Sequence, residues 1–179
     1  ETLFKNWNPV PIASASIAQV YRAHLPKYGD VAVKVRRPGI EKNIRTDLGI
    51  LKRLGKIVQL FSRNLRQINL NEVFGQIESW LLSEIDFRNE ANNLDLITNS
   101  YHGKMRKLIG EYADIIVFPN VYRDFSSNQV ITMEFIEGVP VRNFKTIENN
   151  PLYDIPASLK ASMGAIMRTW INGEEFFFH

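Results

Sequence analysis

The sequence predicts an α+β fold, in which an antiparallel sheet comes first and helices follow. Two observations support this prediction. Residues 17–25 and 31–35 form two strand-like runs on either side of a turn at 26–30, and Pro38-Gly39 ends this part of the chain. From Ile40 onward, apolar residues recur every three or four positions, which is the period of a helix.

Helices are expected over most of residues 40–100. The first has about twenty residues, with much of its other face occupied by Lys and Arg; its apolar face is Ile40, Ile44, Leu48, Leu51, Leu54, Val58 and Phe61. A second pattern runs through 73–81 and a third through 87–97. These two patterns fit either one bent helix or two helices.

Short β-rich runs return after the helices. Residues 115–118 and 130–135 are separated by the turn-forming Ser126-Ser127-Asn128, and we expect them to pair as antiparallel strands. A further helix is expected from about Leu152 to Trp170. The chain then ends at Phe176-Phe177-Phe178-His179.

Composition excludes several classes of function. The 179 residues are 45% hydrophobic, so the chain can bury a core. Its net charge is +3, and the basic and acidic residues are interspersed along the chain, so we expect no nucleic-acid partner. Cysteine is absent and the three histidines lack ligand spacing, so we expect no metal site. No apolar run reaches the roughly 20 residues of a membrane span, and Glu1–Lys5 resembles no signal peptide. We therefore expect a cytoplasmic protein, with any membrane association peripheral or through segments outside this chain.

A loop of small residues and a lysine give the first sign of function. The loop Ala13-Ser14-Ala15-Ser16-Ile17-Ala18 leads to Val20, and Lys34 follows fourteen positions later on the next strand. Small residues let backbone N–H groups approach phosphate oxygens, and a lysine on the return strand can reach the same phosphates. Alanine restricts the loop more than glycine and adds Cβ atoms, so we expect altered phosphate contact.

An acidic cluster supplies candidate partners for this lysine. At 100° per residue, Asp86 and Glu90 share a helical face, whereas Glu84 lies opposite Asp86, so one straight helix cannot direct all three to one site. Residues 83–86 also fit a capping box with Ser83 as the N-cap, which is a purely structural explanation.

The order of elements resembles the N-terminal lobe of a protein-kinase-like fold, with extra helices inserted after the lysine strand. We expect residues 1–140 to form this lobe, with the insertion at about 40–100 and a hinge at 132–136. Residues 141–179 are expected to begin a helical C-terminal lobe.

Three sequence blocks resemble the UbiB/ADCK family of atypical protein-kinase-like ATPases. They are the alanine-rich loop in residues 11–21, Val31-Ala32-Val33-Lys34 followed by Pro38-Gly39, and Glu84-x-Asp86 leading to Glu90-Ala91. The resemblance implies that Lys34 contacts phosphates and pairs with Glu90, beside a catalytic pair of Glu84 and Asp86. The residues it implies for ATP or ADP are Ala13, Ser14, Ala15, Ser16, Ala18, Val20, Ala32, Lys34 and the hinge residues Met133, Glu134, Phe135 and Ile136.

The resemblance also implies a biological setting, and the chain departs from the family pattern in two places. It connects the chain with isoprenoid quinone biosynthesis, and with membrane lipid or quinone-biosynthesis proteins as partners. The family's Lys-x-Gly-Gln motif has no match in residues 1–10, and its catalytic Asp and Asn would follow His179. We therefore expect Mg²⁺ only in a complete parent protein and no catalysis by this chain alone. The alternative is a non-catalytic pseudokinase scaffold that binds nucleotide or a partner protein.

Overall fold

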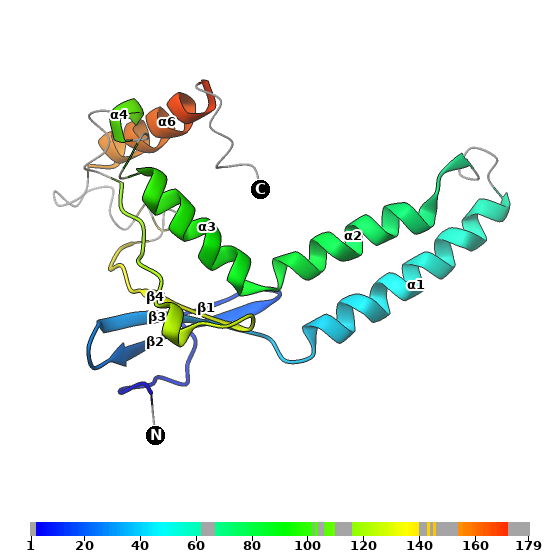
Figure 1. Ribbon diagram of the computed structural model, residues 1–179, viewed down its shortest axis with the longest axis horizontal. Helices are drawn as coiled ribbons and strands as arrows, with labels where there is room; N and C mark the ends of the chain where they lie inside the picture. The colour runs from blue at the N-terminus through cyan, green and yellow to red at the C-terminus, as the bar shows by residue number, and fades with distance from the viewer. Residues whose placement is uncertain are drawn as a thin grey trace. The chain divides into compact units, whose positions relative to one another are not determined.

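The computed structural model describes residues 3–61, 67–101, 103, 106–109, 116–139, 143, 145 and 154–171. The chain divides into two compact units, Glu1–Ala91 with Tyr122–Met133, and Asn92–Val121 with Glu134–His179. A four-stranded sheet and several helices confirm the α+β fold (Figure 1). The boundary predicted between residues 140 and 141 falls outside the described residues and stays a prediction.

The sheet has the strand order β1-β2-β3-β4. Its strands are β1 (Ala13–Ser14), β2 (Ala18–Leu25), β3 (Gly29–Arg36) and β4 (Val130–Glu134). β2 and β3 pair antiparallel over their whole lengths, from Ala18 opposite Arg36 to Leu25 opposite Gly29. Gly29 has a φ of 85°, which a residue without Cβ adopts at little cost, so the chain can reverse there. Both strands predicted at the start of the chain are thereby confirmed.

The core of the first unit lies against one face of this hairpin. Ala23, Leu25, Val31 and Val33 are each at most 2% exposed, and partly buried aromatic and aliphatic side chains pack on them. These residues have odd numbers in both strands. Since side chains alternate along a strand, the even-numbered Val20, Ala32 and Lys34 project from the opposite face.

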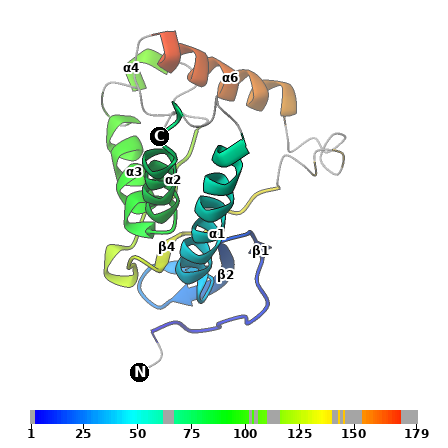
Figure 2. The ribbon, with the colours of Figure 1, turned by 90° about the vertical axis from the view of Figure 1, so that its right-hand side faces the viewer.

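Helices α1 (Ile40–Phe61) and α2 (Leu70–Glu84) form a hairpin that leaves the sheet after β3 (Figures 1 and 2). Gly39, with a φ of 75°, turns the chain into α1, and Asn69 caps α2 by accepting a hydrogen bond from the Glu72 N–H. The two helices lie close together at Gly55, where a Cβ would lie 2.8 Å from Leu70 Cδ1. The first predicted helix is confirmed.

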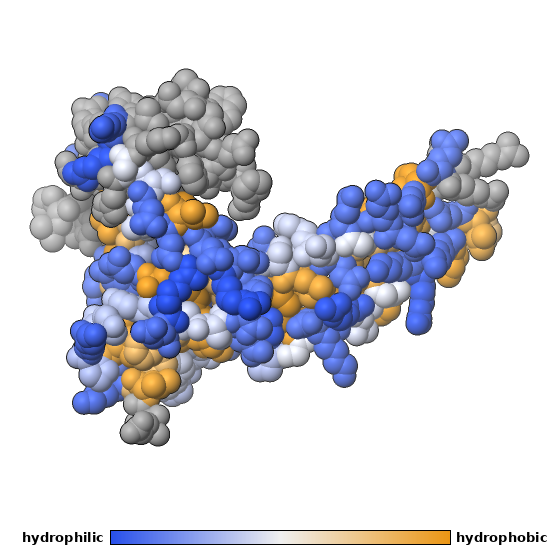
Figure 3. All heavy atoms as spheres, in the orientation of Figure 1, coloured by the Kyte–Doolittle hydropathy of each residue, from blue (hydrophilic) through white to orange (hydrophobic). Residues whose placement is uncertain are grey.

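The apolar stripe predicted for α1 is mostly not buried. Leu48 is 4% exposed, but Leu54 is 52% and Phe61 is 86% exposed, and Figure 3 shows hydrophobic and hydrophilic side chains mixed on the hairpin. Ion pairs from Arg45 and Lys52 to Glu78 join α1 to α2 instead, at 2.9 and 3.0 Å. The hydrogen bond from Lys52 holds the pKa of Glu78 below its usual value.

The second and third helical patterns belong to two separate helices. α2 ends at Glu84 and α3 spans Phe87–Ser100, so the chain breaks at Ile85-Asp86. Ile85 is 2% exposed and its carbonyl accepts a hydrogen bond from Arg36 at the end of β3, at 3.2 Å. The break is therefore tied to the sheet by both burial and a hydrogen bond.

The strand pair predicted at 115–118 and 130–135 is half wrong. Val130–Glu134 forms β4, but residues 116–120 have no regular structure and Ile115 lies outside the described residues. Among residues 116–122, the backbone bonds to β4 are those of Asn120, whose carbonyl accepts from the Glu134 N–H, and of Tyr122, whose N–H donates to Thr132. Pro119 has no N–H to offer a ladder, which limits pairing before this point. The 3-10 helix η4 (Arg123–Phe125) then leads toward β4.

The second unit contains α4 (Arg106–Ile109) and α6 (Ile155–Ile171), which contact each other. Asp154 caps α6 by accepting a hydrogen bond from the Ala157 N–H at 2.9 Å. Tyr101 is 3% exposed and packs against Ile116 and Phe118. The helix predicted at 152–170 is confirmed for its described part, whereas residues 176–179 lie outside the described residues. In the described part of the chain, no helix is long and apolar enough to cross a membrane.

Candidate functional site

Lys34 and Glu90 form an ion pair in the first unit. Lys34 lies on β3 directly opposite Val20 of β2, and its Nζ donates to Glu90 Oε2 at 2.5 Å. Glu90 belongs to the first turn of α3, and the two side chains are 24% and 36% exposed. The structure thus joins residues 56 positions apart, and this pair remains accessible to a ligand.

Two of the predicted loop residues lie on the same side of the sheet as Lys34. Ala13 is opposite Val20, which in turn is opposite Lys34, while Ala18 and Ala32 have the same even-numbered orientation on their strands. Ala13, Ser14, Ala15 and Ser16 are exposed, whereas Ala18 is 1% exposed. One sheet face therefore carries Ala13, Ala18 and the lysine.

The loop is closed by hydrogen bonds of its own. The Ala15 N–H donates to the Ala18 carbonyl at 2.9 Å, so this backbone donor is already engaged within the loop. In this conformation, the Ala15 N–H is therefore not among the loop donors that could meet a phosphate.

Arg37 holds the loop to the end of β3, and the sequence argument missed it. Its guanidinium donates to the Ala15 carbonyl at 3.0 Å and to Ser14 Oγ at 2.8 Å, and its backbone N–H donates to the Ile17 carbonyl at 2.8 Å. Arg37 lies immediately after the lysine strand. A basic residue at that position was the sequence feature that could have indicated a contact with the loop.

The other two acidic residues are not used in the same way as Glu90. Glu84 is the last residue of α2 and is exposed. Asp86 precedes α3, and its carboxylate accepts hydrogen bonds from the Arg88 N–H at 3.1 Å and from Arg88 Nε at 2.9 Å. The structure therefore brings Glu90, but neither Glu84 nor Asp86, to Lys34.

The capping-box prediction with Ser83 as N-cap is wrong. Ser83 lies in the last turn of α2, where its hydroxyl donates to the Trp80 carbonyl at 2.7 Å. Asp86 occupies the capping position instead, because α2 continues through Ser83 and the free N–H groups begin only with α3. Its hydrogen bond from Arg88 lowers the pKa of the Asp86 carboxyl.

Replacement of Asp86 by alanine is expected to destabilise the first unit by about 0.5–2 kcal/mol, because α3 loses its cap. Asp86→Asn keeps an oxygen for the Arg88 N–H and should lose less. Because the folded-state pKa lies below the unfolded value, the charged cap stabilises the fold above pH about 4, and this contribution disappears as the pH falls further. Urea unfolding of both variants at pH 7 and pH 3 tests this; equal losses for alanine and asparagine at pH 7 would contradict the cap.

The predicted hinge residues differ in availability. Thr132 is 0% exposed, and its hydroxyl donates to the Phe125 carbonyl at 2.7 Å, so it is committed to the core. Glu134 accepts from Asn120 Nδ2 at 2.7 Å. Met133 and Phe135 are half-buried and Ile136 is 46% exposed. A role of Met133–Ile136 in binding adenine stays a prediction.

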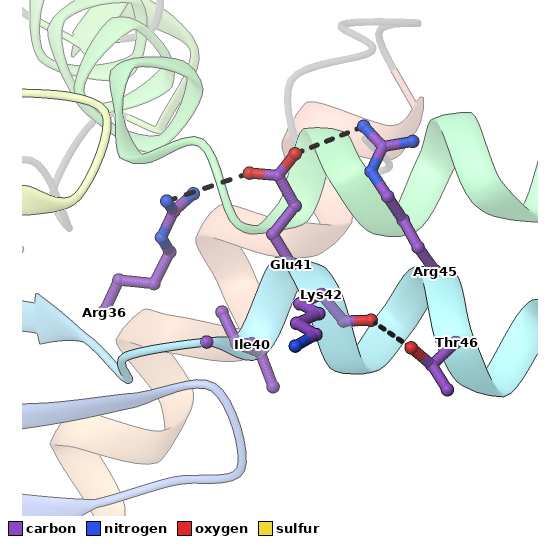
Figure 4. A pocket seen from close by; sticks show the side chains of 7 residues that line it. Arg36, Ile40, Glu41, Lys42, Arg45 and Thr46 are labelled. Carbon is purple, nitrogen blue, oxygen red and sulfur yellow. Dashed lines mark hydrogen bonds and ion pairs between the residues drawn. The ribbon is translucent and has the colours of Figure 1, made fainter.

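An open hollow of about 580 Å³ lies where β3 leads into α1 (Figure 4). Its lining carries three basic side chains, Arg36, Lys42 and Arg45, and one acidic side chain, Glu41. Arg36 and Arg45 both contact Glu41, at 4.0 and 3.2 Å. Lys34 does not line this hollow. We place the candidate site at the Lys34–Glu90 pair, because that pair joins the predicted strand lysine to its predicted carboxylate partner.

The part of the chain that the structure describes has no group of three or more His, Asp or Glu side chains able to hold a metal ion. Asp86 is already bound to Arg88 and Glu90 to Lys34. These residues therefore do not make a Mg²⁺ site by themselves.

Comparison with known proteins places this geometry in a family. The family model of the ABC1 atypical kinase-like domain matches residues 1–170. The chain belongs to the ABC1 atypical kinase-like family. This membership confirms the kinase-like character of the fold and agrees with the resemblance to UbiB proteins.

Curated relatives of this ABC1 domain are much longer than the chain. It is 33% identical over 177 residues to a probable protein kinase UbiB of Marinobacter nauticus, covering 98% of the chain and 28% of that protein. It is 33% identical over 153 residues to the chloroplastic protein ACTIVITY OF BC1 COMPLEX KINASE 3 of Arabidopsis thaliana, covering 85% of the chain and 20% of that protein. The chain thus spans about a quarter of the length of such relatives.

A solved structure shares the fold. The complex of Rv3197 with erythromycin from Mycobacterium tuberculosis matches this ABC1 domain with a TM-score of 0.59 and 30% identity, over 78% of the chain and 32% of that protein. The kinase-like fold therefore rests on both sequence and structure.

Proposed function

We propose that this ABC1 domain binds the phosphates of ATP or ADP beside Lys34. The observation that carries the proposal is the Lys34–Glu90 pair, at 2.5 Å, on the sheet face that also carries Ala13 and Ala18 of the alanine-rich loop. Such a pair between a strand lysine and a helix glutamate holds the lysine for phosphate contact in kinase-like folds. Glu90 takes one of the three donors of the ammonium, which leaves donors for phosphate oxygens.

The chain supplies positioning and charge in this proposal. Lys34 neutralises phosphate charge, Glu90 fixes the direction of its ammonium, and Arg37 holds the loop closed above the strands. Bound Mg²⁺, held by residues of a longer protein, would neutralise the remaining phosphate charge. Phosphoryl transfer or ATP hydrolysis, and a link to isoprenoid quinone biosynthesis or membrane lipid, are proposed for that longer protein on the family resemblance.

Calorimetric titration of the chain with ATP and with ADP tests the proposal. We expect saturable binding of at least one nucleotide, and inorganic phosphate should compete at high concentration. Absence of heat with both nucleotides, from protein whose circular dichroism shows it folded, would reject the proposal. Hydrolysis by the longer protein, with and without Mg²⁺ and lipid, then separates an ATPase from a scaffold that only binds nucleotide.

Substitution of Ala15 by glycine is expected to change the ratio of ATP to ADP affinity by about two- to fivefold, because glycine relaxes the loop by roughly 0.5–1 kcal/mol. The Ala15 N–H and carbonyl both hold the closed loop, so the relaxed loop can redirect its donors. Ala157→Gly, at an exposed position of α6, is the matched control. Identical affinities of Ala15→Gly and the wild type for both nucleotides would refute this role of the loop.

A further inference from the structure

Lys34 has a second contact besides Glu90. Its Nζ lies 4.7 Å from the centre of the Phe87 ring, within the distance of about 6 Å at which an ammonium is attracted to an aromatic face. Phe87 is 1% exposed, so the ring holds this position without competition from water. The ammonium is therefore held by a carboxylate and by a ring.

Both contacts come from one turn of α3. Phe87 and Glu90 are three positions apart and therefore lie on the same helix face. The Phe87 N–H donates to the Asn128 carbonyl at 3.2 Å, and the preceding Ile85 carbonyl is held by Arg36 at 3.2 Å. The start of α3 is thus fastened to the strand that carries Lys34 and to the segment before β4.

We propose that Phe87 is a positioning residue that, together with Glu90, holds the Lys34 ammonium in its site through the face of its ring. An aliphatic side chain of similar size would fill the space but would not attract the ammonium, because the attraction comes from the negative face of the aromatic ring. As regards nucleotide binding, this role rests on the proposed function. The hold on Lys34 itself does not require a nucleotide.

A fluorination series at position 87 separates this role from packing. Incorporation of 4-fluoro-, 3,4,5-trifluoro- and pentafluorophenylalanine weakens the negative ring face, nearly cancels it and finally reverses it, while nearly keeping the shape. Acetic anhydride labelling of Lys34, followed by mass spectrometry with exposed Lys56 as internal reference, reports the hold on the ammonium. We expect labelling of Lys34 to rise with each step, by roughly fivefold at the last.

The same series is titrated with ATP. The dissociation constant should rise in parallel with labelling, reaching about 5- to 30-fold for the last member. Phe125, half-buried in the core cluster, carries the same fluorinated residues as the control and should change neither quantity. Phe87→Leu, which keeps an apolar side chain without a negative face, should lie close to the trifluoro protein, whose ring face is nearly neutral.

Each outcome decides one claim. Flat labelling across the series, or an equal rise in the Phe125 controls, overturns the positioning role of Phe87 whatever happens to ATP. If labelling of Lys34 rises along the series but the chain binds neither ATP nor ADP, Phe87 does position Lys34 and the proposed nucleotide function is rejected. If labelling of Lys34 rises along the series but the affinity for ATP is unchanged, Phe87 has no role in nucleotide binding.

Discussion

Replacement of Lys34 by alanine is expected to weaken binding of ATP and ADP by roughly 10- to 100-fold, the loss typical of a hydrogen-bonded charge pair with a ligand. The lysine is 24% exposed and its partner Glu90 is 36% exposed, so water can solvate the carboxylate that is left behind. The fold should therefore survive, and the effect should appear in binding rather than in stability. Calorimetry with each nucleotide measures it.

Two further variants sharpen this result. Lys56→Ala removes an exposed lysine from α1 and should bind both nucleotides like the wild type. Glu90→Gln keeps a hydrogen-bond acceptor for Lys34 but removes the charge, so its affinity should lie between that of wild type and Lys34→Ala. If Lys34→Ala binds ATP and ADP as tightly as the control, Lys34 has no role in the site. In the longer protein, equal hydrolysis with and without this lysine would lead to the same conclusion.

Replacement of Leu25 by alanine is expected to lower the free energy of unfolding of the first unit by about 2–5 kcal/mol, because it leaves a cavity in the core. Leu25 is 1% exposed at the end of β2 and belongs to the cluster with Ala23, Val31 and Val33. Urea unfolding, followed through hydrogen exchange of peptides from β2 and β3, measures the loss in this unit.

The matched control for this substitution is Leu54→Ala on α1. Leu54 is 52% exposed, so its truncation should change stability by only about 0.5 kcal/mol. Equal losses for the two leucines would mean that the exposed stripe of α1 contributes as much to the fold as the sheet core does.

Much of the first unit could be predicted from local patterns. The turn at Gly29, the strands on either side of it and the helix that begins at Ile40 follow from turn chemistry and from periodicity. The same reasoning failed for residues 115–118 and for the cap at Ser83. In both cases the local preference was present, but adjacent residues prevented the predicted structure. Pro119 offers no N–H to a strand ladder, and α2 continues past Ser83.

The candidate site was predicted in part. The alanine-rich loop and Lys34 could be read from spacing along the chain, and Glu90 was assigned to Lys34 through family resemblance. Arg37 and Phe87 were missed, because a position after the lysine strand and a position in the apolar pattern of 87–97 do not show which groups the side chains contact. Their roles depend on what lies beside them after folding.

The sequence by itself determined the strands of the β2–β3 hairpin and the family to which the chain belongs. Both could be recognised from short stretches, because each strand, turn and motif consists of residues close together along the chain. The spacing of Glu84, Asp86 and Glu90 left the partner of Lys34 open, and the family resemblance implied Glu90. The tertiary structure shows that Glu90 meets Lys34, since the break at Ile85-Asp86 gives the three acidic residues different directions. Only the tertiary structure placed the Phe87 ring beside the ammonium. Apolar periodicity predicts which face of an element is buried, but it does not say which residues more than fifty positions apart meet across that face.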